Sequence, residues 1–212
     1  MSTLCPYFDK LTPQVIVNTY ANKGYPLFTE GDYNLNVFGI RTNEDISDRF
    51  NDVIGLLFKE HGAWVLKTYH ATVDPGVYAR KHPMNKNGTA IICEGYYKGV
   101  YSIGLHQGKY KALKQVKPLK YDRMQANPEG RIVRSGNYTT EIAGTNIHRA
   151  TANVNGVSTY ISSANSSWSY GCCVIASNRD FKEFMSYADK AAEIYGNSFS
   201  FALFGEKDLC LS

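Results

Sequence analysis

The sequence predicts a mainly β fold with flanking helices, an α+β protein with one helix near each end of a sheet core. Three observations lead to this prediction. The chain of 212 residues contains 16 Tyr and 18 Gly, a composition that favours strands and turns over an all-helical fold. Between residues 63 and 175 apolar side chains recur at every second position, in short runs separated by Gly, Pro and Asn. Segments with helical spacing lie on both sides of that region.

The first expected element is a helix that begins after Thr12 and ends at Gly24. Thr12 is a suitable N-cap, Pro13 fits the first helical position, and Gly24 is a typical stop. A second helix is expected from about Asp45 to His61, because Thr42 and Asp45 suggest a capping box and apolar residues follow at helical spacing. Residues 1–62 are therefore expected to form a helical N-terminal region, packed on or appended to a core of residues 63–212.

Short strands are expected through the middle of the chain. The runs with a period of two are residues 64–73, 89–97, 99–106, 110–116, 144–150, 157–162 and 172–177. A third helix is expected to follow and to end at Gly196, with one apolar face formed by Phe181, Phe184, Met185, Ala188, Ala192 and Tyr195. A last strand is expected at residues 198–204.

Composition limits the classes of function. The net charge is +4. The five cysteines are irregularly spaced, so we expect no disulfide framework and synthesis in a reducing cytoplasm. The sequence has neither a leader pattern nor an apolar stretch of about 18 residues, so we expect no export signal and no membrane span. The Lys98–Lys120 segment carries six lysines and no acidic residue. This segment is either a solvated strand face or a surface for an anionic polymer.

The stretch SSWSYGCC, residues 166–173, contains a candidate nucleophile. A catalytic cysteine needs a base within hydrogen-bond reach and N–H groups that stabilise an oxyanion. Gly171 permits a tight turn before Cys172, and the amides of Gly171 and Cys172 are candidate oxyanion donors. Cys173 alternates with Cys172 along the strand, so we expect it to point to the opposite face as a small core residue.

His148 is the candidate base among the five histidines. It lies in a short predicted strand, one hairpin before the Gly-Cys turn, whereas His61 and His82 fall at expected surface positions. A lone strand histidine is more often structural, but the pairing with a Gly-Cys turn favours catalysis. His106 is a reserve candidate for a second active-site histidine. The sequence has no His-Glu-x-x-His, no Cys-x-x-Cys and no close pair of histidines, so we expect no metal and no cofactor.

The His and Cys motifs together resemble the signature of the L,D-transpeptidase catalytic domain, the YkuD family. In that family an Ile-His-Gly-Thr strand precedes a Ser-His-Gly-Cys turn, and the matching residues here are Ile147, His148, Ser169, Gly171 and Cys172. The resemblance covers roughly residues 65–205 and implies a β-sandwich or barrel core. It also implies that Cys172 attacks a carbonyl of a peptidoglycan stem peptide while His148 transfers the proton.

The resemblance extends to neighbouring positions and also has departures. Ser169, Tyr170, Gly171 and Arg149 are expected to form the oxyanion and substrate-binding site, and either Ser169 or a backbone carbonyl is expected to orient the His148 ring. Tyr170 replaces the second histidine of the family, and Arg149 replaces the glycine after the first. Val174 stands where transpeptidases carry an arginine, which argues against transpeptidation but not against attack on an amide.

The expected function is a cysteine-dependent peptidoglycan hydrolase, a stem-peptide endopeptidase or carboxypeptidase of bacteriophage type. Such an enzyme is expected to be made in the host cytoplasm and to act on the wall after release, or to travel in the virion. Its expected partners are stem peptides and an anionic wall polymer at Lys98–Lys120, and nucleic acid is not expected. Two alternatives stay open: a true L,D-transpeptidase that forms cross-links, and a catalytically inactive phage structural or wall-binding module.

Overall fold

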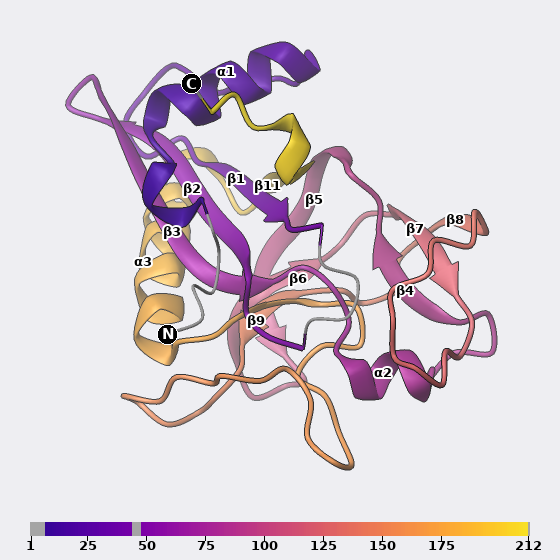
Figure 1. Cartoon of the computed structure of the whole chain (residues 1–212). Helices are drawn as coiled ribbons and strands as arrows, with labels where there is room; N and C mark the ends of the chain where they lie inside the picture. Colours follow the sequence, from indigo (N-terminus) through magenta and orange to yellow (C-terminus); the bar gives the residue numbers. More distant parts are fainter. Residues whose placement is uncertain (1–6, 44–47, 212) are drawn as a thin grey trace.

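The computed structural model describes residues 7–43 and 48–211, whose strands form a closed barrel with a second, three-stranded sheet beside it (Figure 1). The strand order around the barrel is β1-β11-β5-β6-β9-β10-β3-β2. Its strands are β1 (Asn36–Arg41), β2 (Asp52–Glu60), β3 (Ala63–Thr72), β5 (Gly95–His106), β6 (Tyr110–Gln115), β9 (Ile147–Arg149), β10 (Cys173–Ile175) and β11 (Phe199–Gly205). The mainly β fold with flanking helices is therefore confirmed.

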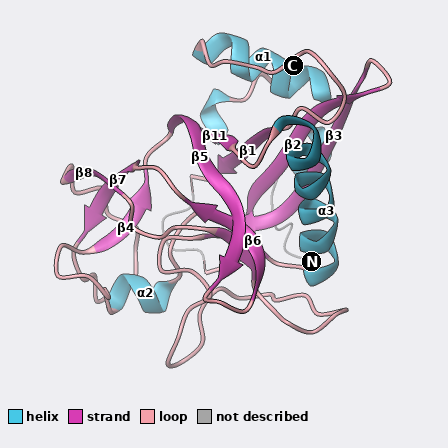
Figure 2. Ribbon diagram, turned by 180° about the vertical axis from the view of Figure 1, so that it is seen from behind, coloured by secondary structure: helices cyan, strands magenta, loops and turns pink. Residues whose placement is uncertain are grey.

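The smaller sheet and the helices lie around this barrel. The sheet has the order β4-β7-β8, with strands β4 (Thr89–Ile92), β7 (Leu119–Met124) and β8 (Tyr138–Glu141). The α-helices are α1 (Pro13–Lys23), α2 (Val77–Lys81) and α3 (Asn178–Tyr195), and short 3-10 helices span Phe8–Lys10 and Glu206–Asp208. Seen from behind, α3 and the smaller sheet lie on opposite sides of the barrel (Figure 2). No helix within the described residues is both long and apolar enough to cross a membrane.

The helices near the two ends form as expected, and each begins at a residue whose side chain caps it. Thr12 accepts a hydrogen bond from the Val15 amide at 3.2 Å, and Gly24 ends α1 in the left-handed conformation, with φ of 64°. Ser177 caps α3 by accepting from the Asp180 amide at 3.2 Å. The apolar stripe of α3 is buried as expected except at its end, where Tyr195 is 45% exposed. Its hydroxyl donates to the Asp32 carbonyl instead.

The second expected helix was wrong, because residues 52–60 form strand β2. The run VIGLLF is apolar on both faces, since Ile54, Leu56 and Phe58 join the main core while Val53 and Leu57 pack beneath α1. A strand buried on both faces shows no alternation, so its period does not distinguish it from a buried helix. Asp45 and Ile46, also part of that expected helix, lie outside the described residues.

The described part of residues 1–62 contains α1 and also supplies two strands of the barrel, β1 and β2. Strand β1 pairs in parallel with β11 and antiparallel with β2. The expected boundary at residue 62 falls within the β2–β3 hairpin, whose strands pair from Asp52↔Ala71 to Glu60↔Ala63. The strand expected at 157–162 is also absent: this segment is a loop, held by an isolated bridge between Val157 and Ser177.

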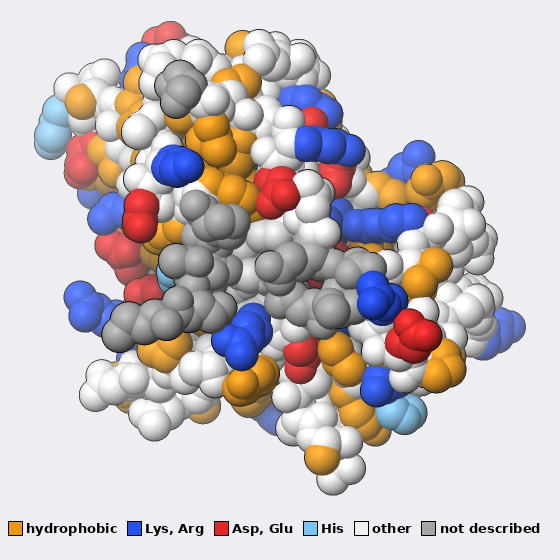
Figure 3. All heavy atoms as spheres, in the orientation of Figure 1, with side chains coloured by type: hydrophobic (Ala, Val, Ile, Leu, Met, Phe, Trp, Pro, Cys, Tyr) orange, Lys and Arg blue, Asp and Glu red, His pale blue; other side chains and the backbone are white. Residues whose placement is uncertain are grey.

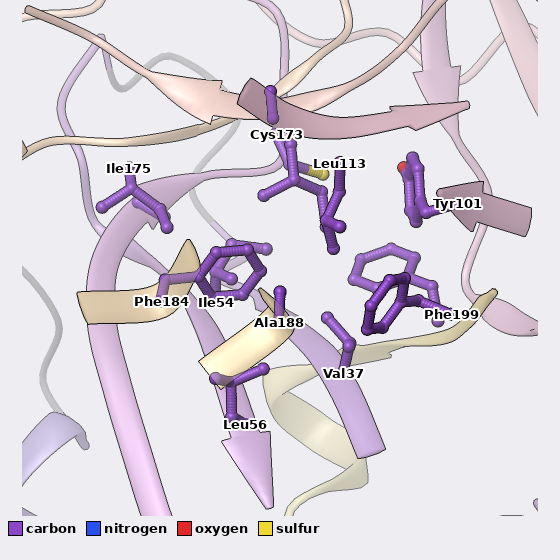
Figure 4. Packing of buried hydrophobic residues seen from close by; sticks show 14 of the residues in the cluster. Val37, Ile54, Leu56, Tyr101, Leu113, Cys173, Ile175, Phe184, Ala188 and Phe199 are labelled. Carbon is purple, nitrogen blue, oxygen red and sulfur yellow. The ribbon is translucent and has the colours of Figure 1, made fainter. Parts of the chain in front are cut away.

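Two apolar cores stabilise the barrel. The main core contains the inward side chains of the strands together with the stripe of α3, and Figure 4 shows Cys173 within it beside Leu113. A second core lies between α1 and the outer faces of β1, β2 and β11, with Tyr20, Phe38 and Phe204 fully enclosed. On the face drawn in Figure 3, Lys and Arg side chains are interspersed with Asp and Glu. Positive and negative side chains are thus mixed on this face.

Candidate active site

Strands β9 and β10 bring the two predicted catalytic residues to the same face of the barrel wall. The strands pair in parallel, with Cys173 opposite Ile147 and Val174 opposite His148. Ile147 and Cys173 both lie in the main core. Because side chains alternate along a strand, His148 and Cys172 point to the outer face. Both line one cavity of about 840 Å³.

This cavity is bordered by the β5–β6 hairpin, by strand β9 and by a long loop, residues 150–170. The β5–β6 hairpin contributes His106, Lys109 and Tyr110, and the loop contributes Trp168, whose side chain is 47% exposed. The remaining border is mostly small and polar. Its other residues are Met84, Gln107, Arg149, Ala150, Thr151, Ala152, Ser158, Thr159, Tyr160, Ile161, Ser162, Ser163, Ser166, Ser167 and Tyr170.

The turn before Cys172 is fixed by Ser169 and Gly171. Gly171 has a φ of +123°, and a Cβ at this position would lie 2.6 Å from the Ala90 carbonyl oxygen. Only glycine fits this backbone conformation beside that carbonyl. The buried Ser169 hydroxyl donates to the Cys172 carbonyl at 2.7 Å and accepts from the Gly171 amide at 3.2 Å. Ser169 thus shapes the turn and does not orient His148.

The Gly171 amide, one of the two expected oxyanion donors, is engaged within this turn. Its N–H already has an acceptor, the Ser169 hydroxyl. The Cys172 amide, by contrast, has no hydrogen-bond acceptor among the residues that the structure describes. Cys172 is therefore the better candidate for an oxyanion donor.

His148 is buried, and one of its ring nitrogens is fixed by the backbone. Its Nδ1 lies 2.9 Å from the Arg149 carbonyl oxygen, so Nδ1 carries the proton and Nε2 has the free lone pair. The orienting group is thus a backbone carbonyl. Burial lowers the pKa of His148 to about 4, and the neighbouring His106 contributes to this shift. The hydrogen bond to the Arg149 carbonyl opposes it.

His106, the reserve candidate, stacks directly on His148. The ring centroids are 4.2 Å apart and the planes differ by 22°. Asn146 accepts from the Gln115 amide through Oδ1 at 2.9 Å, so its Nδ2 donates to Nδ1 of His106 at 3.1 Å. That donor leaves the proton of neutral His106 on Nε2. Burial lowers the pKa of His106, and the positive charges of Lys114 and Lys109 lower it further.

The Cys172 thiol lies close to the backbone of the loop that precedes β9. Its Sγ accepts from the Asn146 amide at 3.4 Å and donates to the Gly144 carbonyl at 3.7 Å. Burial raises the pKa of the thiol to about 11, an effect that the Asn146 amide partly offsets. At neutral pH the resting site therefore contains a neutral thiol and a neutral imidazole, with no hydrogen bond between them.

Arg149 and Tyr110 form one side of the cavity. The guanidinium carbon lies 4.2 Å above the centre of the Tyr110 ring, and Nη1 donates to Asn178 Oδ1 at 3.3 Å. Both residues also border a smaller cavity of about 260 Å³ beside α3. Asn146, Tyr110 and Asn178 were not predicted as site residues, because no local pattern in the sequence links them to His148.

The remaining predicted residues are scattered. His61 is exposed at the β2–β3 turn, and His82 ends α2 and stacks on Tyr78 at 4.4 Å. In the Lys98–Lys120 segment, Lys111 pairs with Asp189 at 3.0 Å and Lys120 lies 4.3 Å above the Tyr138 ring. Cys93, Cys172, Cys173 and Cys210 are free thiols. Within residues 7–43 and 48–211, no group of three or more His, Cys, Asp and Glu side chains is arranged to hold a metal ion.

Comparisons with known proteins do not extend this description. No family model matches the chain, and neither a curated protein nor a solved structure is detectably similar to it.

Proposed function

We propose that the chain is a cysteine-dependent hydrolase of peptidoglycan stem peptides, with Cys172 as nucleophile and His148 as base. One observation carries the proposal: the thiol of the residue before β10 and a histidine of the parallel neighbour β9 face the same cavity, and the histidine Nδ1 is hydrogen-bonded to the backbone. This arrangement leaves Nε2 free as a proton acceptor on the cavity that the thiol also faces. The resemblance of the two motifs to the L,D-transpeptidase signature supplies the substrate class.

The proposed reaction begins from the neutral pair. Cys172 rotates away from the Gly144 carbonyl, its sulfur attacks the peptide carbonyl, and the thiol proton passes to Nε2 of His148. The Cys172 amide stabilises the oxyanion. Nε2 then returns the proton to the leaving amine, which leaves a thioester. Water attacks the thioester with Nε2 again as base, so the carboxylic acid leaves and the thiol is restored.

His106 and Asn146 position the two reacting groups in this mechanism. Asn146 donates its backbone N–H to the thiol and its side-chain amide to His106, which stacks on His148. One residue thereby links the nucleophile to the second imidazole. His106 acts through His148 and is a positioning residue rather than a catalytic one.

The biological setting follows from the same proposal. A phage-type lysin would be made in the host cytoplasm and would meet the wall after release or from the virion. The exposed lysines of the Lys98–Lys120 segment would add attraction to an anionic wall polymer. A true transpeptidase would share the acyl-enzyme step and differ only in its acceptor.

The test is product analysis on purified cell walls. We expect wild-type protein to release muropeptides that carry new amino and carboxyl termini, identified by mass spectrometry. Cys172→Ala should abolish release, and His148→Gln should lower its rate by at least about a hundredfold, as expected for loss of a general base. Cys93→Ala, which removes a free thiol outside the cavity, serves as the matched control and should keep wild-type activity.

Two results would overturn the proposal. Release that survives Cys172→Ala would exclude the thiol as nucleophile. A wild-type protein that releases nothing, with water or with added amine acceptor, yet sediments with cell walls would instead identify a binding module. Cross-linked products with an amine acceptor would identify the transpeptidase.

A further inference from the structure

The cavity around Cys172 has a charge imbalance that the proposed mechanism does not use. Its border includes two cationic side chains, Arg149 and Lys109, and no aspartate or glutamate among the described residues. A cavity lined by cations without counter-charges favours an anionic ligand, because low-dielectric walls strengthen the interaction.

Arg149 is held in place but its charge is not neutralised by an acid. Arg41 and Arg123 each form an ion pair with a carboxylate, Asp74 and Glu141 respectively, at 3.0 and 2.9 Å. Within the described part of the chain, Arg149 has no carboxylate within ion-pair distance. Its partners are the Tyr110 ring and the Asn178 amide oxygen.

The group that holds Arg149 is itself fixed. Asn178 is fully buried, and its Nδ2 donates to the carbonyls of Ala152 and Asn153 at 3.0 and 2.9 Å. These two bonds fix the orientation of the amide, so Oδ1 points to the guanidinium. The Tyr110 face supports the other side of the same group. Arg149 is thereby preorganised, which reduces the entropy lost when it binds an anion.

We propose that Arg149 is a specificity residue that binds a carboxylate of the acyl donor while Cys172 attacks it. The guanidinium uses one of its N–H groups on Asn178 and presents the others as a fork that matches a carboxylate. This inference rests on the proposed function, because only a reaction at Cys172 makes the bound anion an acyl donor. It narrows the substrate class to peptides with a free carboxylate close to the scissile bond.

A reagent pair tests the inference without peptidoglycan. Iodoacetate and iodoacetamide alkylate the same thiol and differ in one negative charge. We expect the ratio of their rate constants at Cys172, measured near pH 9 with the adduct located by peptide mass spectrometry, to fall about three- to tenfold in Arg149→Met, as expected for the loss of one nearby charge interaction of about 1 kcal/mol. Arg149→Lys should keep most of the ratio.

Two controls identify the source of the effect. Arg179→Met removes an exposed arginine that borders a different cavity and should leave the ratio unchanged. Lys109→Met removes the other cation of this cavity and should change it less than Arg149→Met does. An unchanged ratio in Arg149→Met, or an equal fall in Lys109→Met, would overturn the assignment to Arg149.

A second measurement connects the carboxylate to hydrolysis. Stem peptides with a free or an amidated carboxylate beside the scissile bond should differ in KM with wild-type protein, and Arg149→Met should remove this difference. Equal KM values with wild type would contradict the inference even if both peptides are cut. If alkylation shows the charge effect but no peptide is cut, the anion site stands and the proposed hydrolase fails.

Discussion

His148 has a fixed tautomer and a low affinity for protons, and these two properties decide how it can act. Its Nδ1 is committed to the Arg149 carbonyl, and its pKa of about 4 keeps Nε2 unprotonated at neutral pH. The Cys172 thiol, with a pKa of about 11, keeps its proton under the same conditions. A preformed thiolate–imidazolium pair is therefore disfavoured. In the proposed mechanism, proton transfer therefore accompanies attack on the substrate, when the developing oxyanion changes the local charge.

A substitution at His106 tests how this histidine controls its neighbour. His106→Phe keeps an aromatic ring against His148 but removes the charge whose repulsion lowers the pKa of His148. We expect the pKa of His148, followed by NMR titration of the ring carbons, to move upward from about 4. His82→Phe, which alters a histidine stacked on Tyr78, should leave it unchanged. A downward shift in His106→Phe would argue against the electrostatic coupling.

At this scale the sequence indicates the proposed catalytic residues more clearly than the residues that surround them. Gly171 and Cys172 stand in one motif and His148 in another, so local patterns suffice to single them out. The stack of His106 on His148 depends on the barrel placing the β5–β6 hairpin beside β9. Asn178 reaches Arg149 because the first residue of α3 is hydrogen-bonded to the loop that follows β9. Such contacts arise from tertiary packing and have no signal in the spacing of residues.

Elements were predicted correctly where the chain carries stop signals and incorrectly where burial hides the period. Helices α1 and α3 begin at Thr12 and Ser177 caps and end at glycines. Strand β2 was expected as a helix because both of its faces are covered, one by the barrel core and one by α1. The loop at 157–162 has strand-like side chains, yet it borders the cavity and pairs only through isolated bridges.

The turn at residues 169–172 is the element on which the position of the thiol depends. Gly171→Ala would add a methyl group 2.6 Å from the Ala90 carbonyl oxygen at a φ of +123°. We expect a loss of about 2–4 kcal/mol in the free energy of unfolding, because strain at positive φ adds to a backbone clash. Urea unfolding followed by circular dichroism measures this loss.

The matched control separates the two costs. Gly136 also has a positive φ, +72°, but a Cβ there meets no atom within 4 Å. Gly136→Ala should therefore cost only about 1 kcal/mol, the usual penalty for a left-handed alanine. Equal losses at the two positions would mean that the Ala90 contact is not what requires glycine at 171.

At the scale of the whole molecule, three histidines with a lowered pKa each contribute a loss of stability in acid. His70, His106 and His148 all have a pKa lowered by burial, so the unfolded chain binds protons that the folded chain does not. These histidines make their full contribution to the free energy of unfolding above their unfolded-state pKa of about 6.5. The contribution is lost as the pH falls toward 4. His148 alone contributes about 3 kcal/mol to this loss. Asp52, whose pKa is raised by burial to about 7, acts in the opposite direction over the same range.

Comparison with a variant isolates the histidine contribution. We expect the free energy of unfolding of His148→Gln, measured by urea titration between pH 4 and pH 8, to depend less steeply on pH than that of wild type. The two curves should converge as the pH falls, because Gln does not titrate. Parallel curves would show that His148 has the same proton affinity in both states.

The parallel pairing of β1 with β11 has a consequence for how the protein is made. Strand β11 sits between β1 and β5 in the barrel, although almost the whole sequence separates it from β1. During synthesis on the ribosome, β1 must therefore wait for its partner until nearly all other elements have emerged. The wall that carries Cys172 and His148 belongs to the same closed barrel, so a nascent or truncated chain without β11 would have no assembled site.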